Sequence, residues 1–176
     1  MVEFKDFSFI HKYFIGEKQE SLLFLAVGII AILLSVVFFF FMKTNPSFFK
    51  GAAIPLLLVG IIQTVVGYTV YERSDKQRMD IAYNIGVGPI EYTKNQELPR
   101  METVMRKFIV YRWAEIVLAF AGIVLSFLFR QDTDRVFWYG LGITLAIQAI
   151  LMLGADYLAE KRGKNYTSEL KSIINS

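Results

Sequence analysis

The sequence predicts an all-α fold: an integral membrane four-helix bundle with both termini on the cytoplasmic side. Of its 176 residues, 55% are hydrophobic and 15% aromatic. The mean hydropathy of +0.43 is far above that of a soluble domain. Four segments are apolar and long enough to cross a bilayer as helices, namely 21–42, 51–71, 108–129 and 136–158. We therefore treat residues 1–176 as one membrane domain in contact with the lipid bilayer.

The first predicted span, 21–42, is the clearest of the four. It carries no charge and only two hydroxyl side chains. At about 1.5 Å per residue its length is about 33 Å, which exceeds the hydrocarbon core of about 30 Å. A soluble helix of this length would need a polar face, and this one has none. We expect lipid to surround it.

The segment before this span, 1–16, has an amphipathic pattern. Its apolar side chains at helical spacing are Phe4, Phe7, Ile10 and Phe14, and its charged side chains lie largely on the other side. This pattern predicts a helix that lies in the membrane interface. Gly16 is expected to let the chain turn into the first span.

The second predicted span, 51–71, continues into a charged segment. Pro55 lies in its first turns, where the missing N–H costs least. No helix breaker follows until Gly86 and Pro89, so the helix is expected to leave the membrane and continue into the cytoplasm. Residues 72–107 therefore predict a paired helical stalk whose tip holds Gly86 and Pro89.

The second half of this stalk repeats the helical pattern after Pro99. Met101, Val104 and Met105 share one face, which continues into the third span, 108–129. We interpret these three side chains as available for docking a cytoplasmic partner. The polar turn 130–135 leads to the fourth span, 136–158, and 159–176 form a cytoplasmic tail with one or two short amphipathic turns.

The two halves of the chain also resemble each other weakly. The sequence after Glu20, LLFLAVGII, is similar to the sequence VLAFAGIV, which follows Glu115 after one gap. Apolar helices resemble each other by composition, so duplication is one of two interpretations. In either case each half predicts a helical hairpin.

The distribution of Lys and Arg predicts the orientation. Only four of the 19 lie in the two short turns, namely Lys43, Lys50, Arg130 and Arg135. The other fifteen lie on the side of the termini and the stalk. Because basic residues collect on the cytoplasmic side of membrane proteins, we expect both termini and the stalk to be cytoplasmic.

Two amides lie near the middle of predicted spans. Gln63 is in the second span and Gln148 in the fourth, at matched depth. Polar groups are costly in lipid, so these side chains are expected to have partners or a function. One interpretation is that each amide satisfies the other or a backbone carbonyl and holds the helices together. The other is a polar constriction that lines a pore.

Charged side chains occur near the cytoplasmic end of the third and fourth spans. Arg112 and Glu115 are three residues apart on one helix face, which favours an interfacial ion pair. Asp156 could join Glu115 from the fourth span. The alternative interpretation is a carboxylate pair that handles protons or cations.

The composition argues against most enzyme classes. The chain has no cysteine and one histidine, which excludes Cys-ligated metals, thiolate chemistry and multi-His sites within one chain. HExxH, GxSxG and P-loop motifs are absent from the sequence. We predict no metal and no cofactor. A lipid-active enzyme that uses Glu72, Asp75 and Asp80 with a divalent metal is a minor alternative, because basic residues interleave with these carboxylates.

Two functional hypotheses follow. The first is a non-enzymatic, self-associating interaction or accessory subunit that presents its stalk to a cytoplasmic protein partner. The second is an oligomeric channel or pore lined by Gln63, Gln148 and Glu115, with a regulated membrane effector as a subcase. Nucleic acid is not an expected partner, because fifteen basic residues on the predicted cytoplasmic side stand beside fourteen acidic ones.

Overall fold

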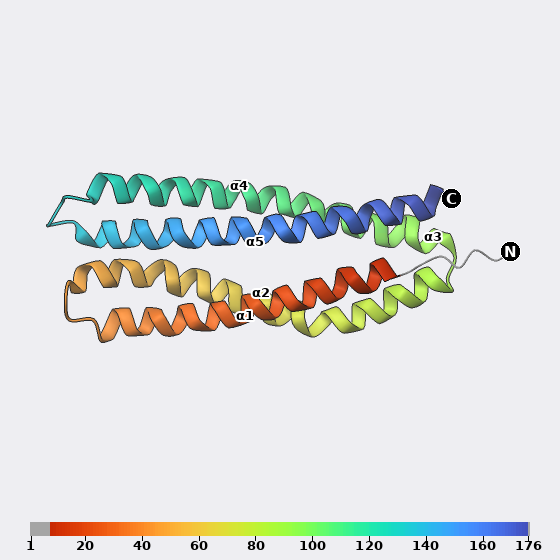
Figure 1. The fold of residues 1–176 in the computed structure, drawn as a ribbon, viewed down its shortest axis with the longest axis horizontal. Helices are drawn as coiled ribbons and strands as arrows, with labels where there is room; N and C mark the ends of the chain where they lie inside the picture. The colour runs from red at the N-terminus through yellow and green to blue at the C-terminus, as the bar shows by residue number, and fades with distance from the viewer. Residues whose placement is uncertain (1–7, 176) are drawn as a thin grey trace.

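The computed structural model describes residues 8–175, and these form an almost wholly helical chain (Figure 1). The elements are α1 (Ser8–Phe40), α2 (Pro46–Gly86), the short α3 (Ile90–Tyr92), the π-helical turn η1 (Thr93–Glu97), α4 (Leu98–Phe129) and α5 (Val136–Asn175). The four long helices are each long and apolar enough to span a membrane. The predicted all-helical fold with four such helices is therefore confirmed.

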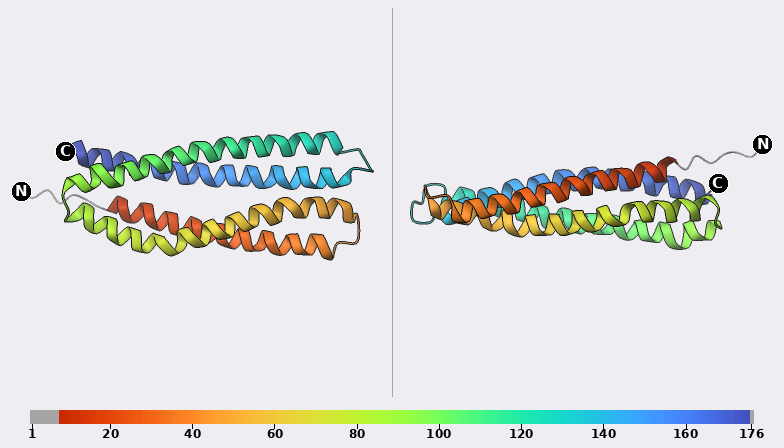
Figure 2. Two further views of the ribbon diagram at one scale, coloured as in Figure 1. Left: turned by 180° about the vertical axis from the view of Figure 1, so that it is seen from behind. Right: turned by 90° about the horizontal axis from the view of Figure 1, so that it is seen from below.

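The four long helices pack as two antiparallel hairpins. Helix α1 packs against α2, and α4 packs against α5. The hairpins meet through α2 and α5, with a smaller contact between α1 and α5. The turns 41–45 and 130–135 lie at one end of an elongated molecule, and the start of α1, α3 and the end of α5 lie at the other (Figures 1 and 2).

Small residues form the contacts inside each hairpin within the spans. Gly28 of α1 lies against α2, where an added Cβ would be 2.7 Å from the carbonyl oxygen of Gly60. Gly122 of α4 lies against α5, where a Cβ would be 2.8 Å from the carbonyl oxygen of Gly142. Without side chains at these positions the helix backbones approach closely, which is how helices associate in lipid.

The two hairpins are joined by a reciprocal contact near the short turns. Gly51 of α2 lies directly against the backbone of Phe137, and Gly140 of α5 lies directly against the backbone of Phe48. On each helix the contact is thus made by a phenylalanine and by the glycine three residues after it. This contact fixes α2 against α5 at the end of the spans opposite the stalk.

The N-terminal part of α1 corrects one prediction. The helix continues through Gly16 without a turn, and Ile10, Tyr13 and Phe14 are buried inside the protein. The predicted separate interfacial helix is therefore wrong for residues 8–16, because their apolar face covers other helices. Residues Phe4 and Phe7 lie outside the described part of the chain.

The C-terminal tail gives a second correction. Helix α5 continues to Asn175 in place of one or two short turns, and Tyr166 and Leu170 on it are fully buried. The predicted paired stalk is consequently a bundle in which all four long helices take part. We call it the stalk bundle (residues 8–20, 72–107 and 159–175). Its core is formed by Ile10, Tyr13, Phe14, Ile81, Ile85, Met101, Tyr166 and Leu170.

The connection between α2 and α4 closes the end of the stalk bundle. Helix α2 ends at Gly86, where the sequence predicts a break, and the chain turns through residues 87–89. The π-helical turn η1 then leads directly into α4. This turn places Glu97 and Thr93 in the interior of the stalk bundle, where both are buried.

Candidate functional site

The two glutamines of the spans are buried inside the chain. Gln63 is 7% and Gln148 is 8% exposed. In the described structure the side-chain oxygen of each has no hydrogen-bond partner, so the two amides do not hydrogen-bond each other. The two amides therefore do not satisfy each other, and a bond from either amide to a backbone carbonyl stays a prediction. Because both side chains face the interior of the chain, neither lies on a surface that could line a lumen between copies.

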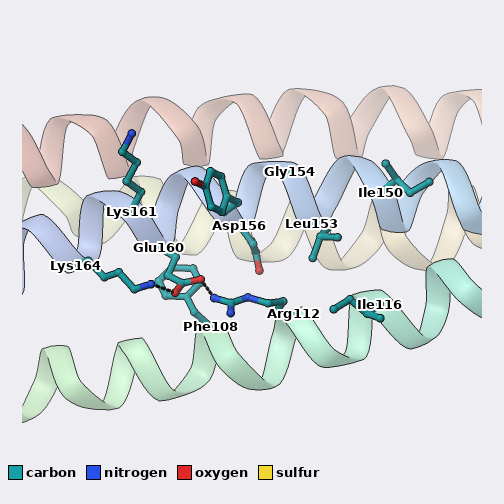
Figure 3. Close-up of a pocket in the computed structure, with 11 residues that line it drawn as sticks. Phe108, Arg112, Ile116, Ile150, Leu153, Gly154, Asp156, Glu160, Lys161 and Lys164 are labelled. Atoms are coloured by element: carbon teal, nitrogen blue, oxygen red, sulfur yellow. Dashed lines mark hydrogen bonds and ion pairs between the residues drawn. The ribbon is translucent and has the colours of Figure 1, made fainter.

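Arg112 has a different partner from the expected one. Its guanidinium forms an ion pair with Glu160 of α5 instead of Glu115 on its own helix. Glu160 also accepts a hydrogen bond from Lys164 at 2.7 Å (Figure 3). The expected pair between Arg112 and Glu115 is thus replaced by a contact between helices, which spacing along one helix could not predict.

Glu115 instead lies against Asp156. Glu115 is 4% exposed, and its carboxyl group is within hydrogen-bonding reach of the Asp156 carboxyl across α4 and α5. In the described structure, Oε2 of Glu115 has no hydrogen-bond partner. The pair is therefore a polar site on the α4–α5 hairpin.

A cavity of about 800 Å³ lies between α4 and α5 beside this pair. Its polar side is formed by Arg112, Glu160, Lys164 and Asp156, and its apolar side includes Phe108 and Ile150. Figure 3 shows Arg112 and Lys164 converging on Glu160, while Lys161 points away from that pair. The ion pairs of Glu160 with Arg112 and Lys164 occupy the polar side of the cavity. They leave few free groups for a ligand.

A second cavity, of about 570 Å³, lies among all four long helices; we call it the central cavity. Asp156 lines both cavities and so lies between them. The lining residues that enter the argument are Glu17, Glu20 and Phe24 of α1; Val66, Val70, Arg73 and Gln77 of α2; Arg100, Lys107, Phe108 and Tyr111 of α4; and Ala159 and Arg162 of α5. Ligand sites typically have volumes of about 300–1,000 Å³, apolar walls and a few polar groups, and the central cavity has this character.

Ion pairs between helices surround the central cavity. Arg162 of α5 holds Glu20 of α1 through two hydrogen bonds, one of them 2.7 Å long. Glu17 lies 3.7 Å from Arg73 of α2 and accepts a hydrogen bond from the Ser74 hydroxyl at 3.3 Å. Burial raises the pKa of the Glu17 carboxyl, although the Arg73 guanidinium acts to lower it. Most of the acidic groups here are therefore already occupied.

Three polar groups of the residues that line the central cavity have no hydrogen-bond or ion-pair partner in the described structure. Nε of Arg162 and Oε1 of Gln77 are buried and have no hydrogen-bond partner in the described structure. Lys107 is exposed and has no ion-pair partner among the described residues. Lys107 is the one of these three groups that a molecule in the cavity can reach, because it is exposed.

The stalk bundle contains a buried network that the sequence analysis did not find. Arg100 donates two hydrogen bonds of 2.7 Å to the carboxylate of Glu97. The Tyr166 hydroxyl donates a third, of 2.8 Å, to the same carboxylate. Burial and then the charge of Glu97 raise the pKa of Tyr166. The spacing of Glu97 and Arg100 indicates a local pair, but nothing in the sequence indicates Tyr166.

The expected docking residues lie mostly inside the stalk bundle. Met101 is 0% exposed, so the prediction that it is available for docking is wrong. Val104 packs against the same core, and Met105 is half-buried beside Gly163. They are covered because α1 and α5 extend alongside α4. Gly86 and Pro89 are exposed at the tip.

Another apolar surface is exposed on the stalk bundle. Met79 and Tyr83 of α2 are each 68% exposed, and Val87, which directly follows the helix, is 76% exposed. Met79 and Tyr83 are one turn apart on one face of α2. Val87 continues this row, because its backbone N–H bonds to the carbonyl of Tyr83. We call this surface the α2 face.

No family model, no curated protein and no solved structure matches the chain. Its class is therefore defined by its own structure: an all-helical chain with four helices suited to spanning a membrane.

Proposed function

We propose that this protein is a non-enzymatic, self-associating membrane subunit that presents its stalk bundle to a cytoplasmic protein partner. The observation that carries the proposal is the exposed α2 face of Met79, Tyr83 and Val87. Contiguous apolar side chains on a surface in water are typical of interaction sites.

The position of the α2 face supports a partner in water over lipid contact. Charged side chains alternate with it on the same helix, namely Lys76, Arg78 and Asp80. The apolar side chains opposite, Ile81 and Ile85, are buried in the core of the stalk bundle. The core is thus complete without the α2 face, and the exposed side chains remain available for another protein.

Self-association would use surfaces other than the glycine contacts between neighbouring helices. Gly28, Gly60, Gly122 and Gly142 are occupied by contacts within the chain. The spans expose large apolar side chains such as Leu33 and Phe127 instead. A mass measurement of the purified protein in detergent tests this part of the proposal. A monomer at all concentrations would contradict it.

Site-directed photocrosslinking tests the partner contact. A photoreactive phenylalanine analogue placed at position 79, 83 or 87 should give one shared adduct in membranes of the source organism. The matched control positions are Ser168 and Glu169, which are exposed on α5 of the stalk bundle. These should give no such adduct.

A charge on the α2 face gives an independent test. Tyr83→Asp should abolish the adduct formed from position 87 while the helical content and Tm of the protein stay the same. Absence of any adduct from all three positions would contradict the proposal. An adduct that also forms from Ser168 would show nonspecific proximity and would contradict it too.

The channel hypothesis has no specific observation in its favour. A pore between copies would be lined by side chains that are exposed on a single chain, whereas Gln63 and Gln148 are buried within it.

A further inference from the structure

We infer that the central cavity binds the phosphate headgroup of a membrane phospholipid, which enters from the bilayer between α2 and α4. The inference is independent of the partner contact proposed above, since it rests on the cavity and not on the α2 face.

The depth of the central cavity matches a lipid headgroup. Val66 and Val70 belong to the predicted second span, and Phe108 and Tyr111 to the start of the third. The basic lining residues lie at or just beyond the ends of these spans. The apolar part of the cavity is therefore in the bilayer and the basic part is at headgroup level, where anionic headgroups meet basic side chains.

The proposed entry to the central cavity lies between α2 and α4. Both helices line the cavity, yet in the described chain they scarcely touch each other, whereas α1 packs on α2 and α4 on α5. In the stalk bundle, Ile81 of α2 and Met101 of α4 belong to one core. The entry is therefore placed on the span side of that core.

The exposed lysine of the central cavity fits a phosphate ester. Lys107 has no ion-pair partner among the described residues. Its ammonium can donate charge-assisted hydrogen bonds to phosphate oxygens.

The walls of the central cavity accommodate an acyl chain. Phe24, Val66, Phe108 and Tyr111 form a continuous apolar lining beside the polar end. An amphiphile satisfies both parts at once, whereas free phosphate satisfies only the polar part. This difference distinguishes a lipid from a small anion as the source of the phosphate.

The experiment measures lipid binding to the full chain in detergent. Phosphatidylglycerol, diacylglycerol and inorganic phosphate are added separately, and the shift in Tm and the number of lipids retained in native mass spectrometry are recorded. We expect phosphatidylglycerol to raise the Tm and to remain bound at one molecule per chain. Diacylglycerol and inorganic phosphate should have little effect.

Two variants and one control localise the binding. Lys107→Gln should weaken phosphatidylglycerol binding about tenfold, the factor that corresponds to the loss of one charge-assisted hydrogen bond. Ala159→Trp should abolish it by filling the cavity. The matched control, Lys171→Gln, removes an exposed lysine of α5 that does not line the cavity, and it should bind lipid as the unmodified chain does.

Three outcomes would overturn the inference. An equal Tm shift with inorganic phosphate alone would show a small-anion site without a lipid. Equal weakening by Lys107→Gln and Lys171→Gln would show nonspecific attraction to the surface. Retention of no phosphatidylglycerol by the unmodified chain would remove the site altogether. Lys107→Gln keeps the test decisive if Ala159→Trp does not fold, because Lys107 is exposed and unpaired in the described structure.

Discussion

Two buried tyrosines make the stalk bundle sensitive to alkaline pH. The rings of Tyr13 and Tyr166 stack with their centroids 4.4 Å apart, and both are buried. Burial raises the pKa of Tyr13 to about 12 from an ordinary value of 10.0, and it raises the pKa of Tyr166 as well. Above pH 10 the unfolded chain releases phenol protons that the folded chain keeps. The free energy of unfolding should therefore fall as the pH rises from 10 to 12.

The expected size of this effect follows from the shift. Two pKa units correspond to about 3 kcal/mol for Tyr13. Thermal unfolding in detergent at pH 8 to 12 measures it. Tyr13→Phe should keep most of the Tm at pH 8 and reduce the loss above pH 10. Tyr83→Phe, which changes an exposed tyrosine, should retain the full loss, and an identical profile for both variants would refute the assignment.

Glu97 is a second residue on which the stability of the stalk bundle depends. Glu97→Leu should lower the free energy of unfolding by about 3–5 kcal/mol, because it removes the partner of the Arg100 guanidinium and of the Tyr166 hydroxyl. The double variant Glu97→Leu/Arg100→Met should recover part of this loss, since no unpaired guanidinium remains. Denaturation of the two variants in the same detergent compares them. A double variant as unstable as the single one would exclude the ion pair as the cause.

At the residue scale the sequence predicts chemistry better than it predicts partners. The carboxyl groups of Glu115 and Asp156 and the amide of Gln63 are conspicuous because polar groups in apolar segments are costly. The partner of Arg112, however, depends on how α4 and α5 are aligned along each other. That alignment is set by close contacts such as the one at Gly122, which a hydrophobic pattern does not contain.

At the scale of the helices, glycines set the distance between neighbours. An alanine at Gly122 would place its Cβ 2.8 Å from the carbonyl oxygen of Gly142, so α4 and α5 must move apart. Gly122→Ala should destabilise the protein by about 1–3 kcal/mol, the usual cost of overpacking. Gly154→Ala is the matched control on the same hairpin, because no described atom outside its own stretch of helix backbone lies within 4 Å of the added Cβ. Thermal unfolding of both variants measures the difference, and equal effects would contradict the packing role.

The helices themselves were predictable and their ends were not. Long apolar segments determine the spans, because only a helix satisfies its backbone in lipid. Gly16 was interpreted as a turn, yet α1 continues through it, and an added Cβ would be 2.8 Å from the Arg162 side chain. The glycine therefore makes room for an arginine of α5. A single sequence does not distinguish these two roles of glycine.

At the scale of the whole molecule, the structure shows which parts lie at the same end of the bundle. The start of α1, α3 and the end of α5 lie at one end of the molecule, and the two short turns lie at the other (Figure 1). The hairpin pairs follow from the short connections, because short turns join neighbouring helices. The contact between the hairpins at Gly51 and Gly140 depends on how closely the two helix backbones fit together. A hydrophobic pattern in the sequence does not predict that fit.

Single-cysteine labelling separates the fold from its orientation. The chain has no cysteine, so a substituted one is the sole thiol. Glu91→Cys and Ser168→Cys mark the end that holds α3, and Thr133→Cys marks a short turn; all three positions are exposed. The fold requires that the first two behave alike and opposite to the third. The excess of Lys and Arg further predicts that a membrane-impermeant maleimide labels only Thr133→Cys in intact cells. Labelling of the other two alone would reverse the orientation and leave the fold intact, whereas different labelling of Glu91→Cys and Ser168→Cys would contradict the fold itself.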